Sequence, residues 1–403
     1  MDVAAASPLA APAPIVAPAR AAHARLDSVD LLRGAVMILM ALDHARDFFT
    51  DTFFDPLDLS RTTPALYFTR WITHFCAPVF MFLAGTGASL SLGRGKTKQQ
   101  LARFLITRGL FLIAADQIVM RILWFSSVGV DPFVAATLTG LGWSMVALAG
   151  FVWLPSSAIA AIAVVLVAGH DAFDGFTGAA WGPLQWVWAL LHGNLAAPSP
   201  HLLSAYPIVP WAGVMALGYV AGGLYRIEAT RRRRMLFALG AGLCALFLAL
   251  RWANVYGDPV AWTHQATAFR TLLSFLNCGK YPPSLLYLCM TLGPALIALA
   301  ALERARGPVA NVVLLYGRVP MFYYFAHIAL LHAAAFCAAA VAGKPLPFTA
   351  MFANDSAAPI PGYGWPLPVV YAAWIASVAV LYPACAWYWQ LKKRSGFWLL
   401  GYV

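Results

Sequence analysis

Long apolar stretches separated by short polar or basic segments run through most of this chain. They approach the length of a membrane-spanning helix, which needs about 20 apolar residues to cross a hydrocarbon core of roughly 30 Å. Ten such segments are predicted: residues 28–49, 67–92, 101–124, 132–154, 156–169, 205–225, 233–253, 281–302, 317–341 and 366–390. The segment 156–169 is short for a span. The stretch from Trp181 to Trp188 is expected to form an interfacial or re-entrant helix instead of a crossing. The pattern predicts an all-α, polytopic membrane helical bundle of about 10 transmembrane helices.

Composition supports this class and narrows the chemistry. Of the 403 residues, 61% are hydrophobic and 11% are charged, with a mean hydropathy of +0.72, which is far from a soluble domain. The six cysteines are scattered without the spacing of a zinc site or a disulfide framework, so no metal site is expected. Residues 1–26 are rich in Ala and Pro and are expected to form a disordered tail, with residues 27–403 as a single transmembrane domain.

Basic residues gather in alternate loops between the predicted spans. With a cytoplasmic N-terminus, 19 of the 27 Lys and Arg residues lie on the cytoplasmic side and 8 lie outside. The 19 are Arg20, Arg25, Arg33, Arg94, Lys96, Lys98, Arg103, Arg108, Arg226, Arg231 to Arg234, Arg304, Arg306, Arg318, Lys392, Lys393 and Arg394. Because cytoplasmic loops carry an excess of Lys and Arg, an even number of spans with both termini in the cytoplasm is predicted, in the inner (plasma) membrane.

The net charge of +11 therefore requires no nucleic-acid partner. The run Arg231 to Arg234 is interpreted as a topology signal, with an anionic lipid or an acyl-carrier phosphate as the alternative partner.

The first apolar segment is unusual because ionisable residues occupy both of its ends. As a helix about 33 Å long, it places Asp30, Arg33 and His44 on one stripe about 60° wide. A charge at mid-bilayer costs roughly 2.5–3.5 kcal/mol, so this stripe is expected to face a protein interior or a wet cavity. The alternative is ion pairing within the helix around Arg46.

Polar residues in the second and third segments are further candidates for a substrate site. His74 lies at a depth similar to that of His44, and a satisfied core histidine is the equally weighted alternative. Asp116 and Arg121 lie toward the outer end of the third segment. Together with Gln117, they either close the same polar cavity or merely pair with each other.

Two later segments carry candidates as well. Lys280 places a cation at the outer entrance of the eighth segment, although snorkelling to the interface explains it equally well. His327 and His332 in the ninth segment are five positions apart and do not share a helix face. A bis-histidine haem would therefore need one ligand from each of two helices.

Six short motifs, taken in order, resemble one family of membrane enzymes. They are LDSVDLLRG, MALDHARDFF, RWITHFCAPVFMFLAG, YPIVPWAGVMALGY, FLNCGKYPPSLLYL and GRVPMFYYFAHI. Together they are similar to bacterial membrane proteins of the heparan-alpha-glucosaminide N-acetyltransferase catalytic-domain family, over nearly everything after residue 25. The spacing from Arg33 and Gly34 to His44 also resembles the first helix of the acyltransferase-3 family, in which the corresponding histidine is held to be essential.

The resemblance implies transfer of an acetyl or other acyl group from cytoplasmic acyl-CoA to a sugar or glycan at the membrane or its outer face. Acyl-CoA is then a co-substrate, and no bound cofactor is expected. Arg33 is expected to meet the donor phosphate or to neutralise Asp30. In the animal glucosaminide enzymes the active histidine follows the first span, whereas Thr50 to Phe68 contains none here, which directs the catalytic assignment to His44.

The chemistry of acyl transfer agrees with this assignment. Transfer to a hydroxyl or an amine needs a base that works near neutral pH, and an unperturbed imidazole suits the task. Asp47, three residues further on, is the expected orienting carboxylate, with Asp43 as its competitor. His74 is the second candidate for the base.

A secondary transporter of a small polar or anionic solute is the alternative function, because transporters also place ionisable residues on helices at the membrane midplane. The two halves of the chain show no convincing internal repeat, which disfavours it. A haem or quinone electron carrier is less favoured still. The sequence does not identify the acceptor or the acyl chain. It also does not decide whether a covalent acyl-enzyme or a homo-oligomer forms.

Overall fold

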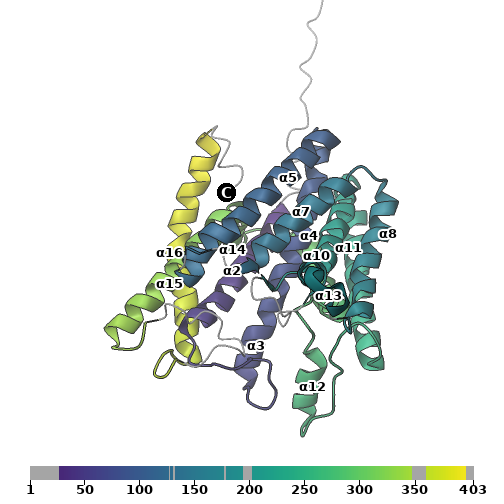
Figure 1. Cartoon of the computed structure of the whole chain (residues 1–403). Helices are drawn as coiled ribbons and strands as arrows, with labels where there is room; N and C mark the ends of the chain where they lie inside the picture. The colour runs from purple at the N-terminus through teal and green to yellow at the C-terminus, as the bar shows by residue number, and fades with distance from the viewer. Residues whose placement is uncertain are drawn as a thin grey trace, which may run out of the picture.

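The chain folds into a bundle of α-helices (Figure 1). This computed structural model describes residues 27–126, 128–129, 132–176, 178–193, 202–346 and 360–395, so the tail expected at 1–26 lies outside the described residues. Within this part of the chain, the strands β1 (Phe133–Ala135) and β2 (Leu202–Ser204) pair in parallel. The prediction of an all-α fold is confirmed.

Each of the ten predicted segments contains an α-helix. The α-helices are α2 (Asp27–Phe49), α3 (Pro64–Ile72), α4 (Cys76–Gly93), α5 (Lys98–Ala115), α6 (Arg121–Phe125), α7 (Thr137–Phe151), α8 (Ser156–Gly169), α9 (Gln185–Leu191), α10 (Ile208–Ala221), α11 (Ala229–Ala253), α12 (Ala268–Leu276), α13 (Leu285–Leu302), α14 (Pro308–Arg318), α15 (Pro320–Val341) and α16 (Leu367–Arg394). Among the described residues, seven helical stretches are long and apolar enough to cross a membrane. The chain is therefore a multi-pass membrane protein, while the count of ten crossings stays a prediction.

Helix α2 lies at the centre of the bundle. It packs against α4, α13, α14, α15 and α16, so elements from both halves of the chain surround it. Helices α3 and α12 project at one end of the bundle, and α16 ends at the opposite end, where α4 also passes into α5 (Figure 1). The basic clusters at 94–98 and 392–394 therefore share one end of the molecule, as the charge pattern predicts.

The second predicted span is interrupted beside His74. A 3-10 turn (Thr73–Phe75) separates α3 from α4, and Pro78 follows in the first turn of α4. Proline has no N–H, so the carbonyl of His74, four residues earlier, loses its helical partner. The hydroxyl of Tyr287 in α13 donates to this carbonyl at 2.7 Å.

Two other predicted spans are also divided. A five-residue π-helical turn (Asp116–Met120) joins α5 to α6. In the ninth segment α14 ends at Arg318, and Pro320 begins α15. Asp116 and Met120 in the first break and Val319 in the second are buried, whereas Ile118 and Val119 are exposed, so each break has one side facing the bundle interior.

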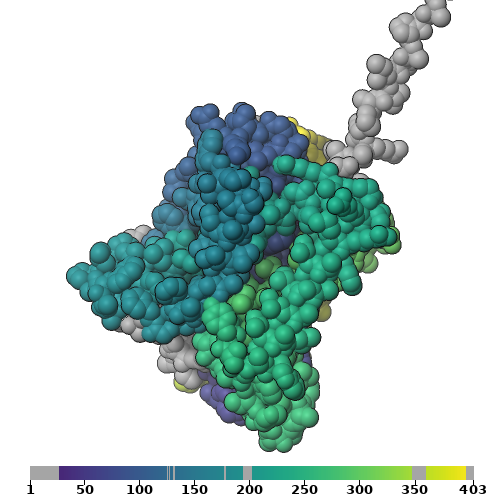
Figure 2. Space-filling model, turned by 90° about the vertical axis from the view of Figure 1, so that its right-hand side faces the viewer, coloured from purple at the N-terminus to yellow at the C-terminus, as the bar shows by residue number. Residues whose placement is uncertain are grey.

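The tryptophan-rich stretch forms a 3-10 helix (Ala179–Leu184) followed by the seven-residue α9. At 1.5 Å per residue, α9 is only about 10 Å long, which is too short for a crossing. In Figure 2 the teal surface of this region projects from the side of the bundle.

Glycines allow backbone contact at two helix crossings. A Cβ on Gly317 in α14 would lie 1.8 Å from the carbonyl oxygen of Asp30, and one on Gly34 would lie 2.0 Å from that of Val313. Gly85 in α4 meets α10 in the same way, whereas Gly87 has no atom within 4 Å of a Cβ built on it. Gly85 therefore permits close packing of α4 on α10, and Gly87 makes no such contact.

Candidate active site

His44 in α2 and His327 in α15 form a hydrogen-bonded pair. Nδ1 of His44 lies 2.7 Å from Nε2 of His327, and the two ring planes are inclined by only 10°, with centroids 4.9 Å apart. His327 is fully buried, and its Nδ1 lies 2.7 Å from the carbonyl oxygen of Tyr323, one turn earlier in α15. These contacts join residues 283 positions apart in the sequence.

This chain of hydrogen bonds determines both tautomers. A carbonyl oxygen only accepts, so Nδ1 of His327 carries a proton and donates it to Tyr323. A buried neutral His327 then presents an unprotonated Nε2, which accepts from the Nδ1–H of His44. Nε2 of His44 is left with a free lone pair, which is the form that a general base needs.

The aspartates expected to orient His44 have other partners. Asp47 accepts from Arg46 at 2.5 Å, and Asp43 accepts from Arg46 at 3.2 Å and from Arg70 at 2.8 Å. Within the described part of the chain, neither carboxylate makes a hydrogen bond to His44. His327 makes the contact that orients His44 instead. Asp43 and Asp47 bind the nearby guanidinium groups because these are stronger partners for a buried carboxylate than a neutral imidazole is.

A buried cluster of charges surrounds this end of α2. Its members are Asp43, Arg46, Asp47, Arg70 and Lys280, whose ammonium acts electrostatically on both aspartates. Arg46 and Arg70 are only 2% and 8% exposed. The cluster combines two anions with three cations, so it carries a net positive charge next to His44.

His74 lies near this cluster but does not join the histidine pair. Its side chain is buried, and among the described residues neither ring nitrogen has a hydrogen-bond partner. Its ring packs edge-on against Tyr287, with centroids 5.3 Å apart. The structure therefore separates the two imidazoles that the sequence treats as alternatives for the base.

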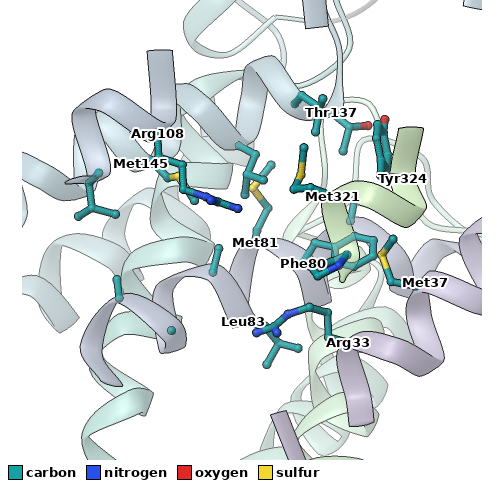
Figure 3. A pocket seen from close by; sticks show the side chains of 18 of the residues that line it. Arg33, Met37, Phe80, Met81, Leu83, Arg108, Thr137, Met145, Met321 and Tyr324 are labelled. Carbon is teal, nitrogen blue, oxygen red and sulfur yellow. The ribbon is translucent and has the colours of Figure 1, made fainter. Parts of the chain in front are cut away.

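A cavity of about 290 Å³ lies between α2, α4, α5, α7 and α15 (Figure 3). Arg33 and Arg108 point into it from two sides, and most of the remaining wall is apolar, including Phe80 and Met81. At another side it is lined by Tyr324, whose ring lies 6.3 Å from that of His44. His44 is not part of the lining, so Tyr324 connects the cavity with the histidine pair.

Positive charge gathers at the arginine end of the cavity. Nη1 of Arg33 donates to Asp30 at 2.6 Å and to the carbonyl oxygen of Gly317 at 3.1 Å. Lys392, near the end of α16, interacts electrostatically with both Arg33 and Arg108. Arg33, Arg108 and Lys392 thus bring three positive charges together, and Asp30 is the acidic group paired with Arg33.

The sequence profile described as "Heparan-alpha-glucosaminide N-acetyltransferase, catalytic" matches residues 25–250, which is more than half of the chain. The chain belongs to this family. The match includes Arg33, His44 and His74, whereas His327 lies beyond it. The chain is also 31% identical over 160 residues to NADH-quinone oxidoreductase subunit N 2 of Solibacter usitatus (strain Ellin6076). That match covers 36% of this chain and 32% of the relative, so the chain spans about a third of the relative's length.

In this member of the acetyltransferase family, Asp116 and Arg121 hold the loop before α7. Asp116 accepts from the backbone N–H of Thr139 at 2.8 Å, and Arg121 donates to the carbonyl oxygen of Pro132 at 2.7 Å. Neither side chain lines the cavity. They fix the beginning of α7, which places Thr137 in the cavity wall.

Sequence reasoning missed Arg108, Tyr324 and the carbonyl of Tyr323 as parts of the site. Arg108 counts in the sequence only as a topology signal, although its position in the interior of an apolar segment is itself a reason to expect a polar partner. Tyr324 and the Tyr323 carbonyl carry no comparable signal, because an aromatic residue or a peptide group in a membrane helix is ordinary.

Proposed function

We propose that this chain is an acyltransferase of the plasma membrane that moves an acetyl group from acetyl-CoA to a sugar or glycan, with His44 as the general base. The observation that carries the proposal is the hydrogen-bonded series from the Tyr323 carbonyl through His327 to His44. The Tyr323 carbonyl accepts a hydrogen bond from His327, and His327 accepts one from His44. This arrangement leaves Nε2 of His44 as the basic nitrogen without the help of a carboxylate. Family membership supports the reaction type.

The cavity suits the donor. Its volume of about 290 Å³ is at the lower end of the range for small-molecule sites, about 300–1,000 Å³, so it accommodates the acyl–pantetheine arm rather than the whole coenzyme. Arg33, Arg108 and Lys392 supply cations for the phosphates at one end. The predicted topology places this end on the cytoplasmic side, where acyl-CoA is available.

The acceptor then reacts beside His44. Its hydroxyl or amine attacks the thioester carbonyl carbon while Nε2 of His44 removes the proton. When the tetrahedral intermediate collapses, the C–S bond breaks, and the departing thiolate takes the proton back from His44. The products are an ester or amide and free CoA, and both histidines return to their original tautomers. The buried cluster of Asp43, Arg46, Asp47, Arg70 and Lys280 is the candidate acceptor-binding surface.

The test is acetyl transfer by the purified full-length protein, with radiolabelled acetyl-CoA as donor and glucosamine as the acceptor probe. General acid–base assistance typically contributes 10²–10⁴-fold, so His44→Ala should lose transfer by about that factor while remaining monodisperse. His74→Ala is the matched control, because His74 is buried near the same charge cluster but lacks the hydrogen bond to His327.

Two results would contradict the proposal. An inactive His74→Ala variant beside a His44→Ala variant of near-normal turnover would move the base to the second span. A wild-type protein that neither releases CoA nor labels any sugar acceptor would instead favour the transporter alternative, since a transporter has no reason to cleave a thioester.

A further inference from the structure

Three side chains with metal-binding atoms come together outside the proposed active site. They are His170, at the end of α8, Asp174, one turn later, and His192, directly after α9. One ligand atom from each lies within 4.8 Å of the others. Nε2 of His192 is 3.6 Å from a carboxylate oxygen of Asp174, and the rings of the two histidines have centroids 5.6 Å apart.

This cluster contains buried polar atoms without partners. The side chain of His170 is fully buried. Its Nε2 lies 3.2 Å from Oδ1 of Asp171, but among the described residues neither ring nitrogen makes a hydrogen bond of regular geometry. The same holds for Oδ1 of Asp171 and Oδ1 of Asp174. Buried polar groups are normally satisfied, so a set of unpaired donors and acceptors facing one another indicates a missing partner with positive charge.

We propose that His170, Asp174 and His192 hold a divalent transition-metal ion of the zinc type. Two imidazole nitrogens and a carboxylate oxygen are ligands that such ions prefer, whereas Ca²⁺ and Mg²⁺ prefer oxygen alone. Ligand atoms around tetrahedral zinc lie about 3.4 Å apart, so small side-chain rotations close the observed spacing. Oδ1 of Asp171 lies 3.2 Å from Nε2 of His170, beside the group of three ligands.

One existing contact must be exchanged when the ion binds. Nε2 of His192 lies 2.7 Å from the carbonyl oxygen of His170 and donates to it in the metal-free form. Stacking against Trp188, with ring centroids 4.9 Å apart, limits His192 to small rotations. Coordination therefore replaces a single hydrogen bond of His192.

The ion would anchor the segment that projects from the bundle in Figure 2. His170 and His192 are the two ends of this segment, and joining them closes a loop over residues 170–192, which lowers the entropy of its detached states. Asp171 already accepts from the backbone N–H of Leu285 at the start of α13 through its other oxygen, Oδ2, at 2.9 Å. The metal thus links the ends of α8 and α9, and Asp171 ties the same segment to α13. The predicted topology places the ion on the outer face of the membrane.

The experiment uses the full-length protein, purified without a polyhistidine tag, stripped with EDTA and then titrated with Zn²⁺ or Co²⁺ alone. We expect one ion per chain after desalting, a rise in melting temperature, and the visible absorption of tetrahedral Co²⁺. His192→Gln and Asp174→Asn should each lose the ion and the thermal shift. His264→Gln, an exposed histidine outside the cluster, should keep both.

The proposal is overturned if the wild-type protein binds no ion, a result that does not depend on any variant folding. It is also overturned if both cluster variants, His192→Gln and Asp174→Asn, bind as much metal as wild type, which would mean adventitious binding only. Asp174→Asn is the decisive variant because its side chain is 19% exposed and the change preserves its shape. Acetyl transfer is not needed as a readout, so failure of the proposed enzyme activity and failure of this site are distinguishable.

Discussion

Pro78 in α4 and Tyr287 in α13 illustrate how single residues compensate one another in this bundle. Proline removes the donor that a helix would supply to the carbonyl of His74, and the buried Tyr287 hydroxyl replaces it. In a membrane protein no water is available at this depth to take over the role. The break beside His74 is therefore stable only as long as Tyr287 is present.

Tyr287→Phe should lower the free energy of unfolding by about 1–3 kcal/mol, because it leaves a buried carbonyl unsatisfied. Thermal unfolding in detergent measures the loss. Adding Pro78→Ala to this variant restores an N–H for the same carbonyl and should recover part of the stability, so the two changes should not be additive. Additive losses would mean that the hydroxyl stabilises the fold by another route.

Arg33 is the residue at which donor binding and charge balance can be separated. Arg33→Ala should raise KM for acetyl-CoA by about 10- to 100-fold, since a hydrogen bond to a charged group contributes about 1.5–3 kcal/mol. Arg103→Ala changes an exposed arginine of α5 that does not line the cavity, so it is the control and should leave KM unchanged. If Asp30→Ala combined with Arg33→Ala restores KM, the arginine only neutralises Asp30.

Between elements, the crossing of α2 and α14 brings the arginine end of the cavity into place. Gly34 and Gly317 let the two backbones touch, and the carbonyl of Gly317 accepts directly from Arg33. A larger residue in either glycine position separates the helices and moves the guanidinium away from the cavity. The small residues and the charged residue next to them thus form one functional unit.

Gly317→Ala should destabilise the protein by about 1–3 kcal/mol, the usual cost of overpacking, and should raise KM for acetyl-CoA at the same time. The added Cβ meets the backbone of α2 at 1.8 Å, which no side-chain rotation relieves. Gly150→Ala in α7 is the control, because no atom lies within 4 Å of its Cβ position. It should be neutral or stabilising by about 0.5–1 kcal/mol. Equal effects of the two changes would exclude a specific role for the crossing.

For the whole molecule, the shared position of the basic clusters at one end makes the topology testable. A reporter fused after Arg394 should be cytoplasmic, because alternate loops carry the excess of Lys and Arg on that side. A second fusion after Gly257, in a loop predicted to lie outside, should give the opposite signal. An external signal after Arg394 would indicate an odd number of spans and would place the arginine end of the cavity away from cytoplasmic acyl-CoA.

The sequence alone determined the class of fold and its approximate spans, because a helix that crosses a membrane needs a long apolar segment, and such segments are visible in the sequence. It also made Arg33 and His44 candidate site residues, since ionisable residues in an apolar helix stand out against their surroundings. The sequence did not determine the form of the interruptions beside Pro78 and Pro320. A proline marks where a helix loses a hydrogen bond, but the length of the resulting break depends on partners such as Tyr287.

Only the tertiary structure decided the partners. Asp47 lies three residues from His44 and is its natural partner within one helix, yet the nearby Arg46 binds that carboxylate. His327 and the meeting of His170, Asp174 and His192 result from the packing of helices far apart in the chain. Local periodicity reports which face a residue occupies along its own helix, but not which other helix will pack against that face.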